Sequence, residues 1–178
     1  MTNNPHQTQA FAQLVKVNSS KYYATAYRML ANKTEAQDIV QEAFTKLWQA
    51  PHKWNPQKQT KFSTWFYRVI INLCLDFKKK RRALPIAEGM EFPAESIDLD
   101  RIIDQQVKAK QLEALIQALP QRQQIALNLS FYEGLSNKES AEIMEINIKA
   151  LESLLMRAKT QLKSQIKDND KQSSLREA

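Results

Sequence analysis

Glycine is nearly absent from this chain, with only two glycines among 178 residues. Glycine supplies most of the positive φ angles that tight hairpin turns and phosphate-binding loops require. A β-sandwich, a β-barrel or a glycine-rich nucleotide site is therefore disfavoured. Because 43% of the residues are hydrophobic and 25% are charged, the chain has the composition of a folded protein. We predict an all-α fold, with a length that suits one typical domain or two small ones.

Charge is distributed unevenly along the chain. Residues 8–82 contain 14 basic and 4 acidic side chains, residues 83–100 contain 0 and 5, and residues 101–178 contain 12 and 10. The net charges of the three segments are therefore +10, −5 and +2. A strongly cationic first segment indicates a polyanionic partner, either a nucleic acid or an anionic membrane surface.

Several classes of function are disfavoured by the residues themselves. Cys74 is the only cysteine, and His6 and His52 are the only histidines, so we expect neither an internal disulfide nor a zinc quartet. The sequence has no catalytic or nucleotide-binding motif, and we expect no enzyme activity, cofactor or metal. No apolar run approaches the roughly 18 to 20 residues of a membrane-spanning helix. These features predict a soluble cytoplasmic protein without a targeting signal.

Apolar side chains recur with helical spacing in two stretches that an acidic segment separates. The first stretch predicts helices at 11–30, at 34–49 with a capping box of Thr34 and Gln37, and from Ser63 or Thr64 to 82. The acidic segment has the composition of a solvated linker. We therefore predict two small helical domains, 8–82 and 101–167, joined by a flexible acidic linker, 83–100, and followed by a polar tail, 168–178.

The second predicted domain contains a helix-turn-helix pattern. Gly134 can end a helix, Ser136 with Glu139 forms a capping box, and Asn147 can cap a longer helix. The turn position that is often glycine is Glu145, which would need a positive φ. The second helix of such a motif enters the major groove of DNA, and its outward-facing residues here are Lys149, Glu152, Ser153, Met156, Arg157, Lys159 and Lys163. An ordinary helical hairpin with a solvated charged face has the same pattern.

Aromatic and basic residues are interleaved around the start of the third predicted helix. Aromatic faces stack on unpaired bases and cations follow phosphates, so the candidates for a single-strand site are Trp54, Phe62, Trp65, Phe66, Tyr67, Arg68, Asn72 and the basic residues 78–82. The alternative is that the aromatic residues form the core, which we prefer for Phe66 and Phe77. Five adjacent cations at 78–82 repel one another unless a polyanion offsets them, which favours nucleic acid.

The second predicted helix has an acidic and amide face inside an otherwise basic segment. This face consists of Asp38, Gln41, Glu42 and Thr45. It is poorly suited to phosphate and could be a docking surface for a protein or a plain solvated face. Cys74 lies on the apolar side of its helix, and we expect it to be a buried small hydrophobe.

Several stretches together resemble one known family. Region two of the bacterial extracytoplasmic-function sigma factors, which belong to the sigma-70 family, closely resembles residues 38–48, 62–72 and 78–82. Region four of the same family is similar to residues 119–136 and 150–159. The resemblance covers most of residues 8–167, in the same order as in the family.

The resemblance implies an RNA polymerase sigma factor that directs promoter-specific transcription initiation in a stress or envelope response. The face with Asp38, Gln41, Glu42 and Thr45 would dock on the clamp coiled coil of core RNA polymerase, which contributes its beta-prime and beta subunits. The loop at 55–61 would capture a flipped base of the minus-ten element. The remaining minus-ten contacts would come from Trp54, Lys61, Phe62, Arg68, Asn72, Lys78, Lys79, Arg81 and Arg82.

The helix-turn-helix would then read the minus-thirty-five element as duplex DNA, through Ser136, Lys149, Glu152, Ser153, Arg157 and Lys159. Glu145, Glu152 and Leu154 depart from the residue types common in the family, so the promoter sequence is left undefined. The resemblance also implies an anti-sigma factor that inserts between the two domains and that can hold the chain at the membrane. From other classes, a stand-alone helix-turn-helix regulator and a helical adaptor without DNA are the alternatives.

Overall fold

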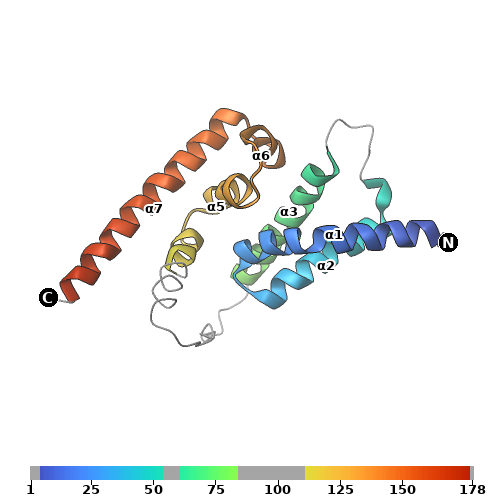
Figure 1. The fold of residues 1–178 in the computed structure, drawn as a ribbon, viewed down its shortest axis with the longest axis horizontal. Coiled ribbons are helices and arrows are strands. Elements are labelled where there is room, and N and C mark those ends of the chain that lie inside the picture. The colour runs from blue at the N-terminus through green and yellow to red at the C-terminus, as the bar shows by residue number, and fades with distance from the viewer. Residues whose placement is uncertain (1–4, 54–60, 84–110, 177–178) are drawn as a thin grey trace.

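The computed structural model of the chain describes residues 5–53, 61–83 and 111–176. Every regular element in these ranges is a helix, which confirms the all-α fold class. The elements are α1 (Pro5–Leu30), α2 (Lys33–Gln49), the short 3-10 helix η1 (Pro51–Lys53), α3 (Phe62–Ala83), α5 (Gln121–Leu127), the π-helical segment η2 (Asn128–Tyr132), α6 (Asn137–Ile143) and α7 (Ile148–Arg176). Residues 111–117 are also helical. We call α1–α3 the first module and residues 111–176 the second module (Figure 1).

A two-residue corner joins α1 to α2. Ala31 has a φ of 54°, and its N–H donates to the Tyr27 carbonyl at 2.7 Å, so α1 ends in a left-handed residue. The side-chain oxygen of Asn32 accepts from the Glu35 N–H at 3.0 Å and caps α2. The predicted cap at Thr34 is therefore wrong. Asparagine is among the best N-cap residues, and it begins the helix as soon as the corner has been turned.

Aromatic rings from three helices form the core of the first module. Tyr22 of α1 and Phe44 of α2 pack on Phe66 of α3, with ring centroids 4.7 Å and 4.8 Å from that of Phe66. Phe66 and Cys74 are fully buried, as expected. Tyr67 is fully buried as well. Its ring is therefore unavailable for stacking on a base in this structure, contrary to the prediction.

The two modules share one hydrophobic cluster. Ile125, Leu129 and Ile143 of the second module are buried in the same cluster as the core of α1–α3, and α6 lies against α3. The sequence predicts two domains on a flexible linker, whereas the structure packs the two modules against each other. Residues 84–100 of the predicted linker lie outside the described residues.

The last helix is longer than predicted. α7 continues to Arg176, although the sequence analysis ends the second domain at residue 167 and leaves 168–178 as a tail. Residues 163–176 contain neither proline nor glycine, so no residue there interrupts the helix. Within the described ranges, no helix is both long and apolar enough to cross a membrane.

Replacing Ala31 with glycine is expected to stabilise the protein. A left-handed conformation costs an L-residue roughly 1–2 kcal/mol, and the greater freedom of glycine in the unfolded chain offsets part of the gain. The free energy of unfolding in urea should rise by about 0.5–1 kcal/mol. Ala12, exposed on α1, is the matched control, because glycine there should lower it by roughly 0.5–1 kcal/mol. A decrease at both positions would contradict the left-handed corner.

Cys74 should be chemically inert in the folded protein. Burial raises the pKa of its thiol to about 12, and the thiolate is the species that reacts with alkylating reagents. Iodoacetamide at mildly alkaline pH should leave the native chain unmodified and label it fully in concentrated guanidinium chloride, as read by mass spectrometry. Rapid labelling of the native protein would show that the core of the first module opens.

Candidate nucleic-acid and protein interfaces

The residues predicted to bind a single strand are distributed along α3 and the residue before it. Asn72 is exposed in the middle of the helix, and Lys79 and Arg82 are exposed near its end. Arg68 is half-buried on the side that faces the second module. Trp54 and the residues 55–60 of the predicted base-capturing loop lie outside the described residues. The polar candidates thus share one helix, but Arg68 faces the second module whereas the other three face solvent.

Lys61 and Arg68 are already paired with carboxylates of the second module. Lys61 Nζ lies 3.0 Å from Glu139 Oε1, and Arg68 Nη1 lies 3.2 Å from Glu145 Oε1. Arg68 Nη2 also donates to the Glu142 carbonyl at 2.5 Å. Both cations therefore face a protein oxygen where the prediction places a phosphate.

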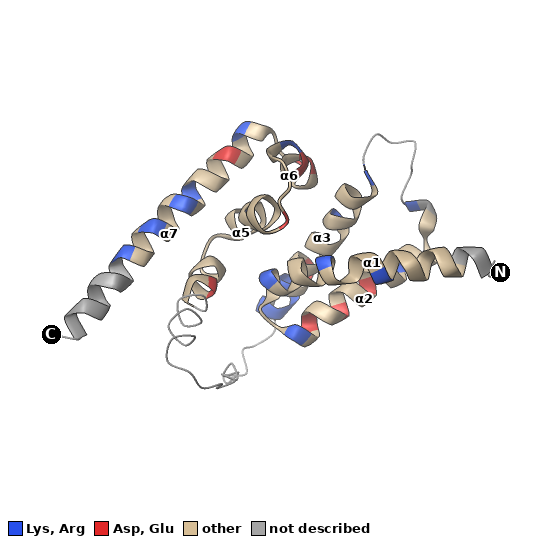
Figure 2. Ribbon diagram, viewed as in Figure 1, with Lys and Arg blue, Asp and Glu red and all other residues tan. Residues whose placement is uncertain are grey.

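The basic end of α3 keeps positive charge that is available to a partner. Among the described residues, neither Lys79 nor Arg82 has a carboxylate partner, whereas Arg81 Nη1 lies 3.3 Å from Glu35 Oε1. Lys78 is half-buried, its Nζ donates to Gln124 Oε1 at 3.3 Å, and burial lowers its pKa. Figure 2 shows basic residues gathered at this end of the helix. An extended polyanion could reach them from solvent.

The remaining aromatic candidates pack on the core. Phe62 and Trp65 are half-buried, and their ring centroids lie 5.4 Å and 6.0 Å from that of Phe66. Both residues help to fix the start of α3 against the first module. A role for Phe62 in binding a strand stays a prediction.

α6, a tight turn and α7 form the predicted helix-turn-helix. The Ser136 hydroxyl accepts from the Glu139 N–H, and Glu139 Oε2 accepts from the Ser136 N–H, each at 3.2 Å, which is the predicted capping box. Hydrogen bonds from Lys61 and then from Ser136 lower the pKa of Glu139 to about 2. Glu145 has the positive φ that its turn position needs, 54°. Asn147 Oδ1 accepts from a backbone N–H of α7 at 2.8 Å, as expected of a cap.

The first turns of α7 expose most of the residues predicted to contact duplex DNA. The exposed ones are Lys149, Glu152, Arg157 and Lys159. Ser153 is half-buried, and its hydroxyl donates to the Lys149 carbonyl at 2.9 Å. Ser136 is exposed, but its hydroxyl is engaged with Glu139 at 2.9 Å. Figure 2 shows basic residues spaced along α7.

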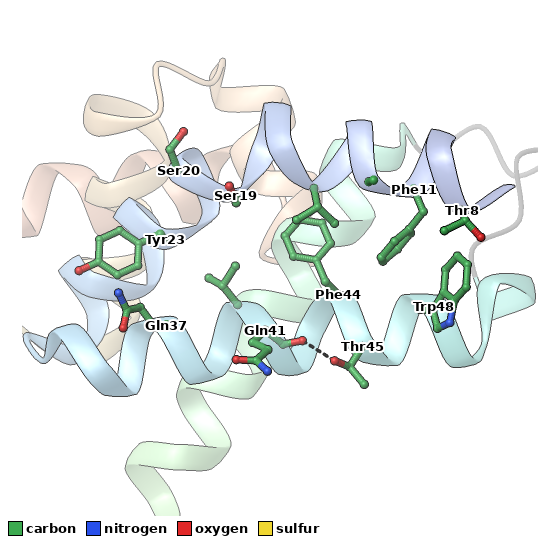
Figure 3. Close-up of a pocket in the computed structure, with 13 residues that line it drawn as sticks. Thr8, Phe11, Ser19, Ser20, Tyr23, Gln37, Gln41, Phe44, Thr45 and Trp48 are labelled. Carbon is green, nitrogen blue, oxygen red and sulfur yellow. Dashed lines mark hydrogen bonds between the residues drawn. The ribbon is translucent and has the colours of Figure 1, made fainter. Parts of the chain in front are cut away.

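A polar face and an apolar groove adjoin on α2. The polar face is exposed as predicted and consists of Asp38, Gln41, Glu42 and Thr45. Beside it, α1 and α2 enclose a groove of about 730 Å³ whose lining includes Phe11, Val15, Tyr23, Val40, Phe44 and Trp48 (Figure 3). This groove could not be predicted from the sequence, because its residues continue the apolar stripes that predict the core. Trp48 belongs to the apolar stripe of α2 but is 37% exposed, which indicates that this stripe is wider than the core requires.

Glu133 forms a polar junction between the modules that the sequence analysis also missed. Its side chain is only 6% exposed. Oε1 accepts from Thr25 Oγ1 at 2.9 Å and from Arg28 Nη1 at 2.8 Å, and Oε2 accepts from the Tyr67 hydroxyl at 2.7 Å. Burial and then the bond to Glu133 raise the pKa of Tyr67, so its hydroxyl remains a donor. These partners lie far from Glu133 in sequence, and no local spacing pattern marks them.

Two family models match the chain over the two modules. The model for sigma-70 region 2 matches residues 14–84, and the model for sigma-70 region 4 matches residues 109–162. The first match spans most of α1 and all of α2 and α3. The second includes the helix-turn-helix. The two matches therefore follow the division of the structure into modules.

Similar proteins align with nearly the whole chain. The ECF RNA polymerase sigma factor SigW of Bacillus subtilis is 29% identical over 170 residues, which cover 89% of this chain and 90% of the relative. The RNA polymerase sigma-H factor of Pseudomonas aeruginosa is 30% identical over 162 residues, 85% of this chain and 83% of the relative.

Solved structures share the fold. The structure of CnrH in complex with the cytosolic domain of CnrY matches with a TM-score of 0.68 at 21% identity and covers 90% of both chains. The sigma factor RpoE of Bartonella quintana, in complex with the anti-sigma factor NepR, matches with a TM-score of 0.67 at 20% identity over 89% of this chain and 98% of that one. With both regions matched in order and relatives of one kind along its length, the chain belongs to the extracytoplasmic-function sigma factors of the sigma-70 family, which are non-enzymatic factors of transcription initiation.

Proposed function

We propose that this sigma factor binds core RNA polymerase and two promoter elements through three separate surfaces. The polar face and the groove of α2 bind core RNA polymerase, α3 binds the melted minus-ten strand, and α7 reads the minus-thirty-five element as duplex. The observation that carries the proposal is that the three surfaces lie on different helices of one sigma factor, each with exposed residues. Because the surfaces are on different helices, one chain can hold the polymerase and two DNA elements together.

The charge and chemistry of each surface support its assignment. The face of α2 carries Asp38 and Glu42 in a module that is otherwise basic, which suits a protein partner better than phosphate. α3 offers the Asn72 amide for a base edge and the cations at its end for phosphates. α7 presents Lys149 and Arg157 close to its N-terminal turns, where a recognition helix meets base edges.

The biological setting is also part of the proposal. Extracytoplasmic-function relatives and structural neighbours solved with anti-sigma factors support control by an anti-sigma factor in a stress or envelope response. The groove between α1 and α2 is an apolar surface on which such a regulator could compete with polymerase. An anti-sigma factor that is itself anchored in a membrane would hold this chain there.

Asn72→Ala should impair promoter opening more than it impairs duplex binding. The lost amide contact to an extruded base is worth roughly 1–3 kcal/mol, so the extent of open complex should fall by about fivefold or more. Reconstituted holoenzyme is tested on a genomic promoter pool by permanganate footprinting, and closed-complex affinity is measured separately. Asp76→Ala, also exposed on α3, is the control. Equal losses in opening and in duplex affinity would refute the role of Asn72.

Glu42→Ala should weaken the complex with core polymerase. If Glu42 is one of the few residues that carry most of the binding energy, its truncation costs more than about 1 kcal/mol, which corresponds to at least a fivefold rise in the dissociation constant measured by fluorescence anisotropy. Glu42 also pairs with Lys46 at 2.6 Å within α2. Lys46→Ala breaks that pair and retains the carboxylate, so it should leave the affinity nearly unchanged. A loss of the same size in both variants would mean that Glu42 acts only through α2 itself.

A further inference from the structure

The turn and helix that face α3 place carboxylates against its cations. Glu139, Glu142 and Glu145 follow one another at intervals of three residues, which is close to one helical turn. Glu139 reaches Lys61 and Glu145 reaches Arg68 at 3.0 Å and 3.2 Å. The backbone carbonyl of Glu142 takes a second donor of the same guanidinium. Two of the cations assigned to the minus-ten strand are thus held by oxygens of the other module.

These surface pairs are too weak to hold the modules together. Side-chain exposure is 73% for Lys61 and also 73% for Glu145, and exposed pairs typically contribute little. Glu133 is different, because its carboxylate is buried and accepts hydrogen bonds from Thr25, Arg28 and Tyr67 of the first module. Removing a buried partner of this kind leaves the other groups unsatisfied. The closed arrangement therefore depends on Glu133 far more than on the pairs that cover α3.

We propose that the chain partly masks its own strand-binding surface, with Glu133 as the latch that keeps Lys61 and Arg68 paired with oxygens of α6 and its turn. The proposal rests on the proposed function, since it takes Lys61 and Arg68 to be strand-binding residues. The mask is partial: Asn72 and the basic end of α3 stay exposed. The free chain consequently holds single-stranded DNA weakly, and full binding requires the modules to separate.

Several contacts besides Glu133 mark Arg28 as the first module's half of the latch. Arg28 lies over the ring of Tyr132 at 4.5 Å, its carbonyl accepts from the Gln117 side chain, and its Nη1 reaches Asn128 Oδ1 at 3.4 Å. The Asn128 amide in turn donates to the Thr25 carbonyl at 3.2 Å. Arg28 belongs to none of the three proposed surfaces, so a change there tests the latch alone.

The experiment compares Glu133→Ala and Arg28→Ala with Glu113→Ala. Glu113 is exposed on the helix at 111–117, where it lines a pocket near Arg28 but has no ion-pair partner among the described residues. Glu113→Ala removes the same charge from the second module as Glu133→Ala does. Small-angle scattering of the full chain measures its radius of gyration. Fluorescence anisotropy measures its affinity for a dye-labelled oligothymidylate strand, a probe suited to sequence-tolerant binding. Far-UV circular dichroism checks that each variant keeps its helices.

Both latch variants should increase the radius of gyration and bind the strand about tenfold more tightly than Glu113→Ala, because the competent state becomes more populated. Releasing two cations from their ion pairs should also steepen the slope of log affinity against log salt by about 0.7 per contact. Adding Lys61→Ala and Arg68→Ala to Glu133→Ala should abolish the gain in affinity and the steeper salt dependence. If Glu133→Ala loses helix content, Arg28→Ala provides the same comparison from the other side of the junction.

An unchanged radius of gyration in folded Glu133→Ala and Arg28→Ala would overturn the latch. An expanded chain that binds the strand no better than Glu113→Ala would overturn the mask. In the second case, Arg68→Ala is tested in holoenzyme: impaired promoter opening there would leave the proposed function standing without the mask. If Lys61→Ala and Arg68→Ala open promoters as well as the unaltered chain, their strand-binding role fails, and the mask fails with it.

Discussion

The buried carboxylate of Glu133 is the interaction on which the arrangement of the two modules depends. A carboxylate removed from water needs hydrogen-bond donors, and Glu133 finds all three of its donors on the first module. Only a few apolar side chains of the second module join the first module's cluster. Separation of the modules would rehydrate Glu133 and its donors and would also expose Ile125, Leu129 and Ile143, which are buried in that cluster. A seam of this kind can hold a closed state and still be opened by a partner.

Charge imbalance explains both the attraction to DNA and the closed arrangement. Residues 8–82 carry 14 basic and 4 acidic side chains, so the first module attracts any accessible anion. In the free chain, the carboxylates of α6 and its turn are the nearest ones, and they meet Lys61 and Arg68. In a transcription complex, phosphates would compete for the same cations. The same electrostatic feature can therefore stabilise two different states of the chain.

Features set by neighbouring residues could be predicted from the sequence, and features set by distant residues could not. The capping box of Ser136 and Glu139 and the positive φ of Glu145 were predicted correctly because each is a local feature. The cap at Asn32 was missed because Thr34 offers a similar local pattern two residues later. The burial of Tyr67 and the junction at Glu133 depend on residues 66 to 108 positions apart. An interleaved pattern of aromatic and basic residues does not distinguish rings that stack on a nucleotide from rings that are buried in a core.

The distance between the two modules before and after polymerase binding tests whether the closed arrangement opens for function. Single cysteines replacing Val17 on α1 and Lys163 on α7, both exposed, accept a pair of dyes while the buried Cys74 stays unlabelled. We expect efficient energy transfer in the free chain and a clear fall in transfer when core polymerase and promoter DNA are added. Low transfer in the free chain, or the same high transfer in both states, would contradict a closed arrangement that opens for function.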